Sequence, residues 1–161
     1  QKIIEFANNG GYVMGVCNGF QILCESGLLP GALLHNNSHK FICKNVYLST
    51  QNMNTCVTVS AEDKALCVPI AHGEGRYFAD ADTLKQLNDN GQVLFRYCDE
   101  NGNITPDSNP NGAEENIAGV SNAAGNVFGM MPHPERAADK ELANTDGGYI
   151  FESIIKTLAV A

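Results

Sequence analysis

The spacing of apolar residues near the start of the chain predicts a strand that turns sharply into a helix. Residues 12–16 are apolar and include β-branched side chains, which is typical of a parallel strand covered on both faces. Apolar residues between positions 20 and 24 then follow the i, i+3, i+4 spacing of one helix face, and Gly27 is placed to end that helix. Cys17 therefore lies at the predicted turn, before the N-terminus of the helix.

The same patterns predict elements along the rest of the chain. Residues 1–9 indicate the end of a helix with an Asn-Gly-Gly cap. Alternating or continuous apolar runs predict strands, and a polar turn between two of them predicts a hairpin. These strands cover residues 41–49, 55–59, 67–71, 93–98, 117–121 and 127–131, the last two forming the hairpin.

Two further helices are predicted in the second half of the chain. The first has Asp80 or Asp82 as its N-cap, apolar Leu84 and Leu87 facing inward, and Gly91 after its end. The second has Asp146 as its N-cap and one i,i+4 ion pair. Its predicted core-facing stripe is Ile150, Phe151, Ile154, Ile155 and Leu158, and its predicted ion pair is Glu152 with Lys156.

Residues 99–116 are rich in Asn, Gly, Pro and acidic residues and nearly lack apolar ones. This composition predicts a surface loop. Long connections in compact domains often bind a ligand or a partner, and a mobile insertion is the equally weighted alternative.

Length and composition predict one domain, residues 1–161. A content of 43% hydrophobic and 17% charged residues is ordinary for a soluble globular protein. The formal net charge of −8 argues against nucleic acid or an anionic membrane as the main partner. No apolar run reaches about 18 residues, and no leader pattern is present, so we expect a cytoplasmic protein.

Six cysteines are scattered along the chain without CxxC spacing, and the four histidines show no HxxxH spacing. This argues against zinc and against a disulfide scaffold. We expect reduced cysteines that, apart from Cys17, fill the core.

The position of Cys17 indicates a possible nucleophile. Free N–H groups and the positive end of a helix dipole lower a thiol pKa and can receive an oxyanion. Gln21 lies one turn further on the same side and is placed to hydrogen-bond a polar substrate. The alternative is that Cys17 is a small buried hydrophobic residue, and the local pattern favours neither reading.

Two other segments carry candidate chemistry. Residues 72–76 read as a Gly-rich loop that presents His72, Glu74 and Arg76 together, without the length or ending of a Walker A loop. Prolines on both sides of His133 exclude a helix there, and on an extended segment Glu135 points to the same side as His133. A carboxylate so placed orients an imidazole, although a histidine between prolines is otherwise a plain loop residue.

Cys17-Asn18-Gly19-Phe20-Gln21 followed downstream by Pro132-His133-Pro134-Glu135 resembles the class I glutamine amidotransferases. Together with LLPGALL, PIAHGEGRY, NPNGA, NIAGV and GMMPHPERA, these motifs are similar to the small-type glutaminase subunit family of phosphoribosylformylglycinamidine synthase over nearly the whole chain. The chain departs from that family in having Ala113 where Ser is usual and in lacking its N-terminal section.

The resemblance implies a flavodoxin-like α/β fold, with an open, mostly parallel sheet and helices on both faces. It also implies a Cys17, His133 and Glu135 triad that hydrolyses glutamine for purine biosynthesis, with Asn18 and Gln21 as substrate-binding residues and His72 and Glu74 as weaker candidates.

Asn18 would supply one oxyanion N–H, and a second would lie upstream of residue 1. No cofactor is expected in this chain, because ATP and Mg²⁺ would belong to a large synthetase subunit. That subunit is the implied partner, and a small bridging subunit is a further candidate.

Two other classes of function stay open at this point. A cysteine peptidase-like member of the same fold would also place a cysteine at an elbow, and a noncatalytic regulatory module would retain the fold but lack part of the triad. The abrupt start, sixteen residues before the nucleophile, indicates an N-terminally truncated chain. If the polypeptide begins here, we expect an unpaired apolar edge on the sheet and self-association through it.

Overall fold

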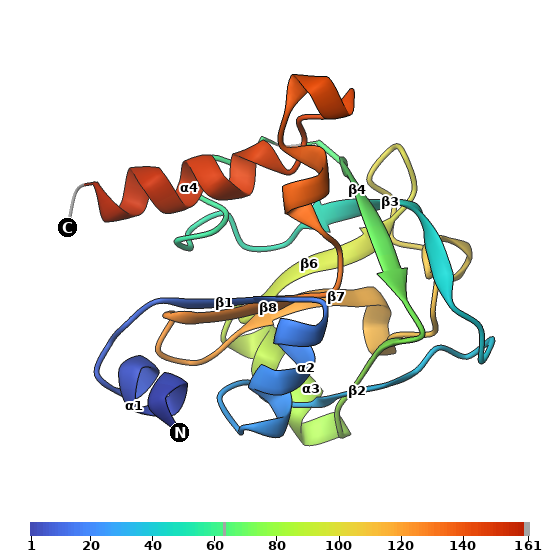
Figure 1. Ribbon diagram of the computed structural model, residues 1–161. Coiled ribbons are helices and arrows are strands. Elements are labelled where there is room, and N and C mark those ends of the chain that lie inside the picture. Colours follow the sequence, from blue (N-terminus) through green and yellow to red (C-terminus); the bar gives the residue numbers. More distant parts are fainter. Residues whose placement is uncertain (63, 160–161) are drawn as a thin grey trace.

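The computed structural model describes residues 1–62 and 64–159 and contains a six-stranded sheet and a separate two-stranded ribbon (Figure 1). The sheet has the strand order β1-β8-β7-β6-β3-β4, and the ribbon pairs β2 with β5. The strands are β1 (Val13–Val16), β2 (Ala32–His35), β3 (Ile42–Thr50), β4 (Leu66–His72), β5 (Glu74–Phe78), β6 (Val93–Cys98), β7 (Ile117–Ser121) and β8 (Val127–Met130).

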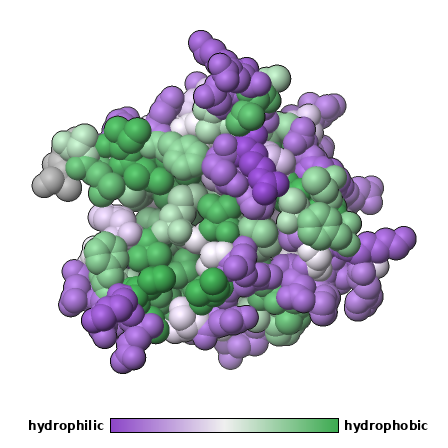
Figure 2. Space-filling view, viewed as in Figure 1, coloured by the Kyte–Doolittle hydropathy of each residue, from purple (hydrophilic) through white to green (hydrophobic). Residues whose placement is uncertain are grey.

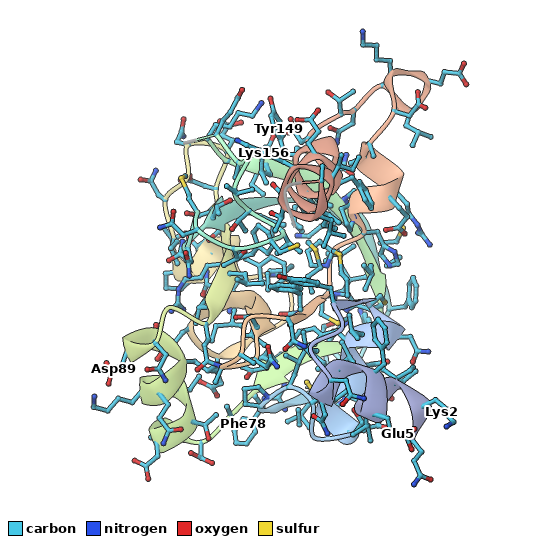
Figure 3. The ribbon with its side chains drawn as sticks, turned by 90° about the vertical axis from the view of Figure 1, so that its left-hand side faces the viewer. Lys2, Glu5, Phe78, Asp89, Tyr149 and Lys156 are labelled. Carbon is cyan, nitrogen blue, oxygen red and sulfur yellow. The ribbon has the colours of Figure 1, made fainter. Side chains whose placement is uncertain are left out.

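Helices lie on both faces of the sheet. Figure 1 shows α2 and α3 on one side of the β1 and β8 strands and α4 on the other. The α-helices are α1 (Lys2–Asn8), α2 (Asn18–Glu25), α3 (Ala81–Asp89) and α4 (Gly148–Leu158), and short 3₁₀ helices are η1 (Pro106–Ser108), η2 (Glu114–Asn116), η3 (Pro134–Ala137) and η4 (Lys140–Leu142). Lys2 and Glu5 on α1 and Asp89 on α3 point outward, away from the interior (Figure 3).

The predicted α/β class with helices on both faces is confirmed, while the strand directions in the described sheet are mixed rather than mostly parallel. Only β1 and β8 pair in parallel. The pairs β3–β4, β3–β6, β6–β7 and β7–β8 are antiparallel. The tight turn between β7 and β8 explains one of these directions, because strands joined by a hairpin must run antiparallel.

The predicted strand over residues 55–59 is wrong. This segment forms turns in which Cys56, Val57 and Thr58 are buried. Just after it, the Ser60 N–H donates to the Ser153 hydroxyl on α4 at 2.9 Å. Its apolar pattern therefore reflects burial of a turn, because packing can bury apolar side chains without strand pairing.

The two predicted helices are present, with one correction to their caps. The Asp80 carboxylate accepts from the Thr83 N–H at 2.8 Å and caps α3 as expected. Asp146 does not cap α4, because its carboxylate accepts from the Cys67 N–H at 2.8 Å and the N-cap position belongs to Gly147.

The predicted core-facing stripe of α4 is only partly buried. Ile150 is 1% exposed, whereas Ile155 and Leu158 are 68% and 46% exposed. Among the described residues, the predicted Glu152–Lys156 ion pair does not form. The spacing of apolar residues therefore predicted the helix correctly but overstated the width of its buried face.

The 99–116 loop is more ordered than its composition predicts. Asn111, Ala113 and Asn116 are buried within it. The Asn116 amide donates to the Tyr97 and Thr105 carbonyls at 3.0 and 2.8 Å. Side-chain amides thus replace apolar packing as the force that holds this segment against β6.

β1 is an edge strand of the described sheet and not a strand covered on both faces. It pairs only with β8, and most of its residues are half-buried. Figure 2 shows apolar side chains gathered over α4 and the adjoining β1 region. The exposed large apolar residues of α1, of the position just before β1 and of α4 are Ile3, Phe6, Tyr12, Phe151, Ile155 and Leu158. An unpaired apolar edge is therefore present, as expected.

A glycine contact fixes the distance between β1 and α2. A Cβ added at Gly15 would lie 2.6 Å from the backbone carbonyl group of Gly19 and from Leu23 Cδ1. A Cβ added at Gly19 would meet nothing within 4 Å. The missing side chain of Gly15, and not that of Gly19, therefore allows the helix to approach the strand.

All six cysteines are free thiols in the structure. Cys56 and Cys98 are buried, but Cys43 is exposed and the others are half-buried, so core filling accounts for only some of them. Within residues 1–62 and 64–159, no helix is long and apolar enough to cross a membrane.

Candidate active site

Cys17 lies at a strained turn between β1 and α2, as the apolar pattern predicted. It is the N-cap of α2 and has φ 52° and ψ −109°, a conformation that costs energy for any residue with a side chain. Its N–H donates to the Met130 carbonyl at 2.8 Å, which ties the turn to the end of β8. A nucleophile elbow exposes its side chain above an α/β sheet through the same kind of strain.

The charge environment of Cys17 differs from the one the sequence predicted. Burial raises the pKa of the Cys17 thiol. The Asn18 N–H and the charge of Arg136 act against this rise, and the charge of Glu135 adds to it. Burial is thus the largest influence on the Cys17 thiol, and it favours the protonated form.

His133 and Glu135 form a close pair. The His133 Nδ1 and Glu135 Oε1 atoms are 2.6 Å apart, and the His133 side chain is 12% exposed. The pair does not form on an extended segment as predicted, because Pro134 begins the 3₁₀ helix η3 directly after His133. A proline is tolerated at the first position of such a turn, where no N–H is needed.

The His133–Glu135 pair fixes the imidazole tautomer. A carboxylate oxygen accepts the Nδ1–H, which leaves a lone pair on Nε2. That Nε2 atom is buried and has no hydrogen-bond partner in the described part of the protein. His133 therefore has an acceptor available for a proton from a neighbouring group.

β4 brings the cysteine and the histidine to one place. The Cys17 Sγ lies 3.9 Å from the Ala71 carbonyl, and the His133 N–H donates to the Pro69 carbonyl at 2.8 Å. The charge of Glu135 also reaches the Cys17 thiol. Cys17, His133 and Glu135, which are far apart in the sequence, thus gather at the end of β4.

The second candidate segment is not a Gly-rich loop that presents three side chains together. His72 is the last residue of β4, and Glu74 is the first residue of the next strand, β5. His72 is 4% exposed, whereas the Glu74 carboxylate is on the surface, 3.4 Å from His35 Nε2. Arg76 Nε donates to the His35 carbonyl at 3.0 Å. Of these side chains, only that of His72 faces the interior.

His72 lies near His133. Burial, and after it the electrostatic interaction with the neighbouring His133, lower the pKa of His72 to about 4. His72 is therefore a neutral imidazole at pH 7, and its Nε2 atom is also buried without a partner among the described residues.

Gln21 and Asn18 line a pocket next to the elbow. Gln21 Nε2 donates to the Glu74 carbonyl at 2.7 Å, which holds the amide group in place. The pocket has a volume of about 400 Å³ and also contacts Leu33 and Glu74. Gln21 is thus fixed by the backbone of β5, and its Oε1 stays available as an acceptor.

Sequence reasoning missed Asn36, which is 0% exposed and contacts His72. Its neighbour Asn37 and the following Ser and His look like an ordinary turn. No local pattern distinguishes a buried asparagine from a turn asparagine, because both follow a short strand. Within the described chain, no group of three or more His, Cys, Asp or Glu residues is placed to hold a metal ion.

The chain is similar to known proteins over most of its length. The model of the CobB/CobQ-like glutamine amidotransferase domain matches residues 1–149. The phosphoribosylformylglycinamidine synthase subunit PurQ of Acaryochloris marina is 54% identical over 159 residues, which are 98% of this chain and 68% of that protein. The subunit of the same name from Synechocystis sp. is 56% identical over 94% of this chain and 68% of its own length.

The chain belongs to the PurQ family. A chain in the solved structure of PurLQS from Thermotoga maritima superposes with a TM-score of 0.82 at 44% identity, covering 97% of this chain and 66% of that one. The chain thus spans about two thirds of the length of these PurQ relatives. The family and the fold class predicted from the motifs are both confirmed, and the chain is a glutamine amidotransferase subunit of the purine-biosynthetic synthase family.

Proposed function

We propose that this chain hydrolyses glutamine to glutamate and ammonia at Cys17, with His133 as the base and Glu135 as its orienting carboxylate. The main support is the 2.6 Å contact between His133 and Glu135 beside a cysteine held at a strained elbow. Membership of the PurQ family gives the substrate class.

The first step needs a base because burial raises the pKa of the Cys17 thiol and so favours its protonated form. His133 Nε2 accepts the thiol proton, and the sulfur attacks the side-chain carboxamide carbon of glutamine. Glu135 stabilises the resulting imidazolium through the Nδ1–H bond. His133 then returns the proton to the departing nitrogen, which leaves as ammonia, and a thioester to Cys17 remains.

Hydrolysis of the thioester uses the same groups in reverse. His133 Nε2 takes a proton from water, the hydroxide attacks the thioester carbon, and the proton then returns to the cysteine sulfur. The Asn18 N–H, which interacts with the sulfur, is placed to donate to the oxyanion. One such donor contributes about 3–4 kcal/mol to the lowering of the barrier in comparable hydrolases.

The pocket beside the elbow is the proposed substrate site. Gln21 and Asn18 line it, and a volume of about 400 Å³ is ample for an amino acid. His72 does not line this pocket, but it stands two residues before Glu74, which does, and its Nε2 atom has no partner among the described residues. The Glu74 backbone carbonyl accepts the hydrogen bond that holds the Gln21 amide in place, while the Glu74 carboxylate faces solvent.

The ammonia is proposed to serve a large synthetase subunit that converts formylglycinamide ribonucleotide to formylglycinamidine ribonucleotide. ATP and Mg²⁺ would belong to that subunit. The support is the name of the PurQ relatives and the PurLQS assembly of the Thermotoga maritima protein. A small bridging subunit is part of the same proposal, and the 99–116 loop is a candidate contact.

The triad is tested on the complete subunit in the presence of its synthetase. We expect a diazo-ketone analogue of glutamine to label Cys17, and His133→Ala to lower turnover by about 10²–10⁴. His72→Ala should act mainly on glutamine binding and leave kcat within a few-fold. Labelling of Cys43 or Cys98 alone, or a normal kcat in His133→Ala, would overturn the proposal.

The same assay separates the proposed function from its rivals. Glutaminase turnover should be weak in the isolated subunit and rise when the synthetase is added, because unused ammonia wastes glutamine. Cleavage of peptides in preference to glutamine would indicate a cysteine peptidase, and neither activity would indicate a noncatalytic module. Full activity without the synthetase would contradict the coupling.

A further inference from the structure

Asn36, directly after β2, is the most fully hydrogen-bonded side chain next to the candidate site. Its Nδ2 donates to the His72 and Lys40 carbonyls at 2.8 and 2.9 Å. Its Oδ1 accepts from the Gly75 N–H at 3.2 Å and lies 3.0 Å from His72 Nδ1. Its own N–H donates to the Gly73 carbonyl at 2.9 Å. The amide thus uses both donors and both acceptor positions inside the protein.

These contacts decide which ring nitrogen of His72 carries the proton. The amide nitrogen of Asn36 must face the two carbonyls, so its oxygen faces the ring. A carbonyl oxygen cannot donate, and the proton in this contact therefore belongs to His72 Nδ1. The other nitrogen, Nε2, consequently carries a lone pair.

The His72 lone pair is held in a confined place. Nε2 is buried and without a partner among the described residues, and the whole residue is 4% exposed. Gly75 closes one side of the ring, because a Cβ there would lie 2.4 Å from His72 Cε1 and Nδ1. An acceptor this deeply buried is costly unless a donor reaches it.

Burial keeps His72 neutral. It is the main cause that lowers the pKa of His72, and the electrostatic interaction with His133 acts in the same direction. Glu135 contacts His133 from η3, and the Glu74 carboxylate lies in solvent beside His35. No carboxylate therefore contacts the His72 ring in the described protein.

We propose that Asn36 is a positioning residue, which holds His72 in the tautomer whose Nε2 accepts a hydrogen bond from an N–H group of bound glutamine. This inference rests on the proposed function of the site. Asn111 supports the same arrangement from the 99–116 loop, because its Nδ2 donates to the Gly75 carbonyl at 2.8 Å. The Gly75 peptide is thus held by one asparagine on each side.

The tautomer is tested directly by nitrogen NMR of the His72 ring in the complete wild-type subunit. We expect a neutral ring at pH 7 with the proton on Nδ1 and an unprotonated Nε2, and a changed Nε2 signal when glutamine binds to a Cys17→Ala variant. A proton on Nε2, a charged ring at pH 7, or no response to glutamine would overturn the proposal. This measurement needs no turnover and no variant of Asn36.

Kinetics test the role of Asn36. In Asn36→Ala, we expect KM for glutamine to rise about five- to a hundredfold while kcat stays within a few-fold, because a buried hydrogen bond to substrate is lost. Asn126→Ala is the matched control. It removes another buried asparagine, whose amide donates to the Ala7 and Gly11 carbonyls at 2.8 and 2.9 Å, and KM should not change.

Asn36→Asp separates positioning from folding. The carboxylate still accepts from His72 Nδ1 but stabilises the charged ring, so the pKa of His72 rises and Nε2 becomes a donor at higher pH. The KM of this variant for glutamine should rise when the pH is lowered from 8 to 6, whereas the KM of the wild-type protein should not. An equal loss at both pH values would show that Asn36 only supports the fold. If the wild-type protein showed no glutaminase activity, the proposed function would be overturned instead. The NMR measurement of the His72 tautomer does not depend on that activity.

Discussion

Gly15→Ala tests whether the contact between β1 and α2 sets the position of Cys17. The added Cβ would lie 2.6 Å from the Gly19 backbone, whereas carbon atoms normally approach to about 3.5–4.0 Å. Strand and helix must therefore separate by about 1 Å. Overpacking of this kind costs about 1–3 kcal/mol. A 1 Å displacement of a reacting group can also lower the rate by about 10².

The assay pairs urea unfolding with glutaminase turnover of the complete subunit. Gly15→Ala should lower the free energy of unfolding by about 1–3 kcal/mol and kcat/KM by about 10–100-fold. Gly19→Ala is the matched control, because its Cβ meets nothing within 4 Å. It should not destabilise the protein and should gain at most about 0.5–1 kcal/mol, because Gly19 is the second residue of α2 and not in its interior. The reasoning fails if Gly15→Ala unfolds at the wild-type urea concentration or if Gly19→Ala is the less stable variant.

Three further outcomes follow from the structure. Because the pKa of buried His72 is lowered from 6.5 to about 4, the unfolded chain binds a proton that the folded chain does not between these pH values. The contribution of His72 to the free energy of unfolding should be fully present above pH 6.5 and fall by up to roughly 3 kcal/mol toward pH 4. In urea titrations at several pH values, His72→Gln should remove this dependence on pH. Asp146→Ala should cost about 1–3 kcal/mol by urea unfolding, because the Cys67 N–H loses its acceptor, and an unchanged midpoint would contradict that role. The 161-residue polypeptide should self-associate through β1, and Val13→Lys at this edge should reduce association in sedimentation; a monomer at high concentration would refute it.

Local patterns in the sequence determined the elements and the chemical identity of the site. The apolar run before Cys17 and the helix spacing after it correctly predicted the β1–α2 turn. The residues around His133 likewise predicted its contact with Glu135, two positions away. These features depend on neighbours in sequence, where steric and periodic rules are strong.

Only the tertiary structure decided the environment of these residues. Burial under the surrounding elements reversed the expected direction of the Cys17 pKa shift. Packing also placed His72 in the interior and Glu74 in solvent, although both stand in the same short motif. Asn36 became part of the site through contacts with residues 36 and 39 positions away, which no local pattern encodes. Desolvation and long-range hydrogen bonds depend on which distant segments meet, and these were settled by the fold.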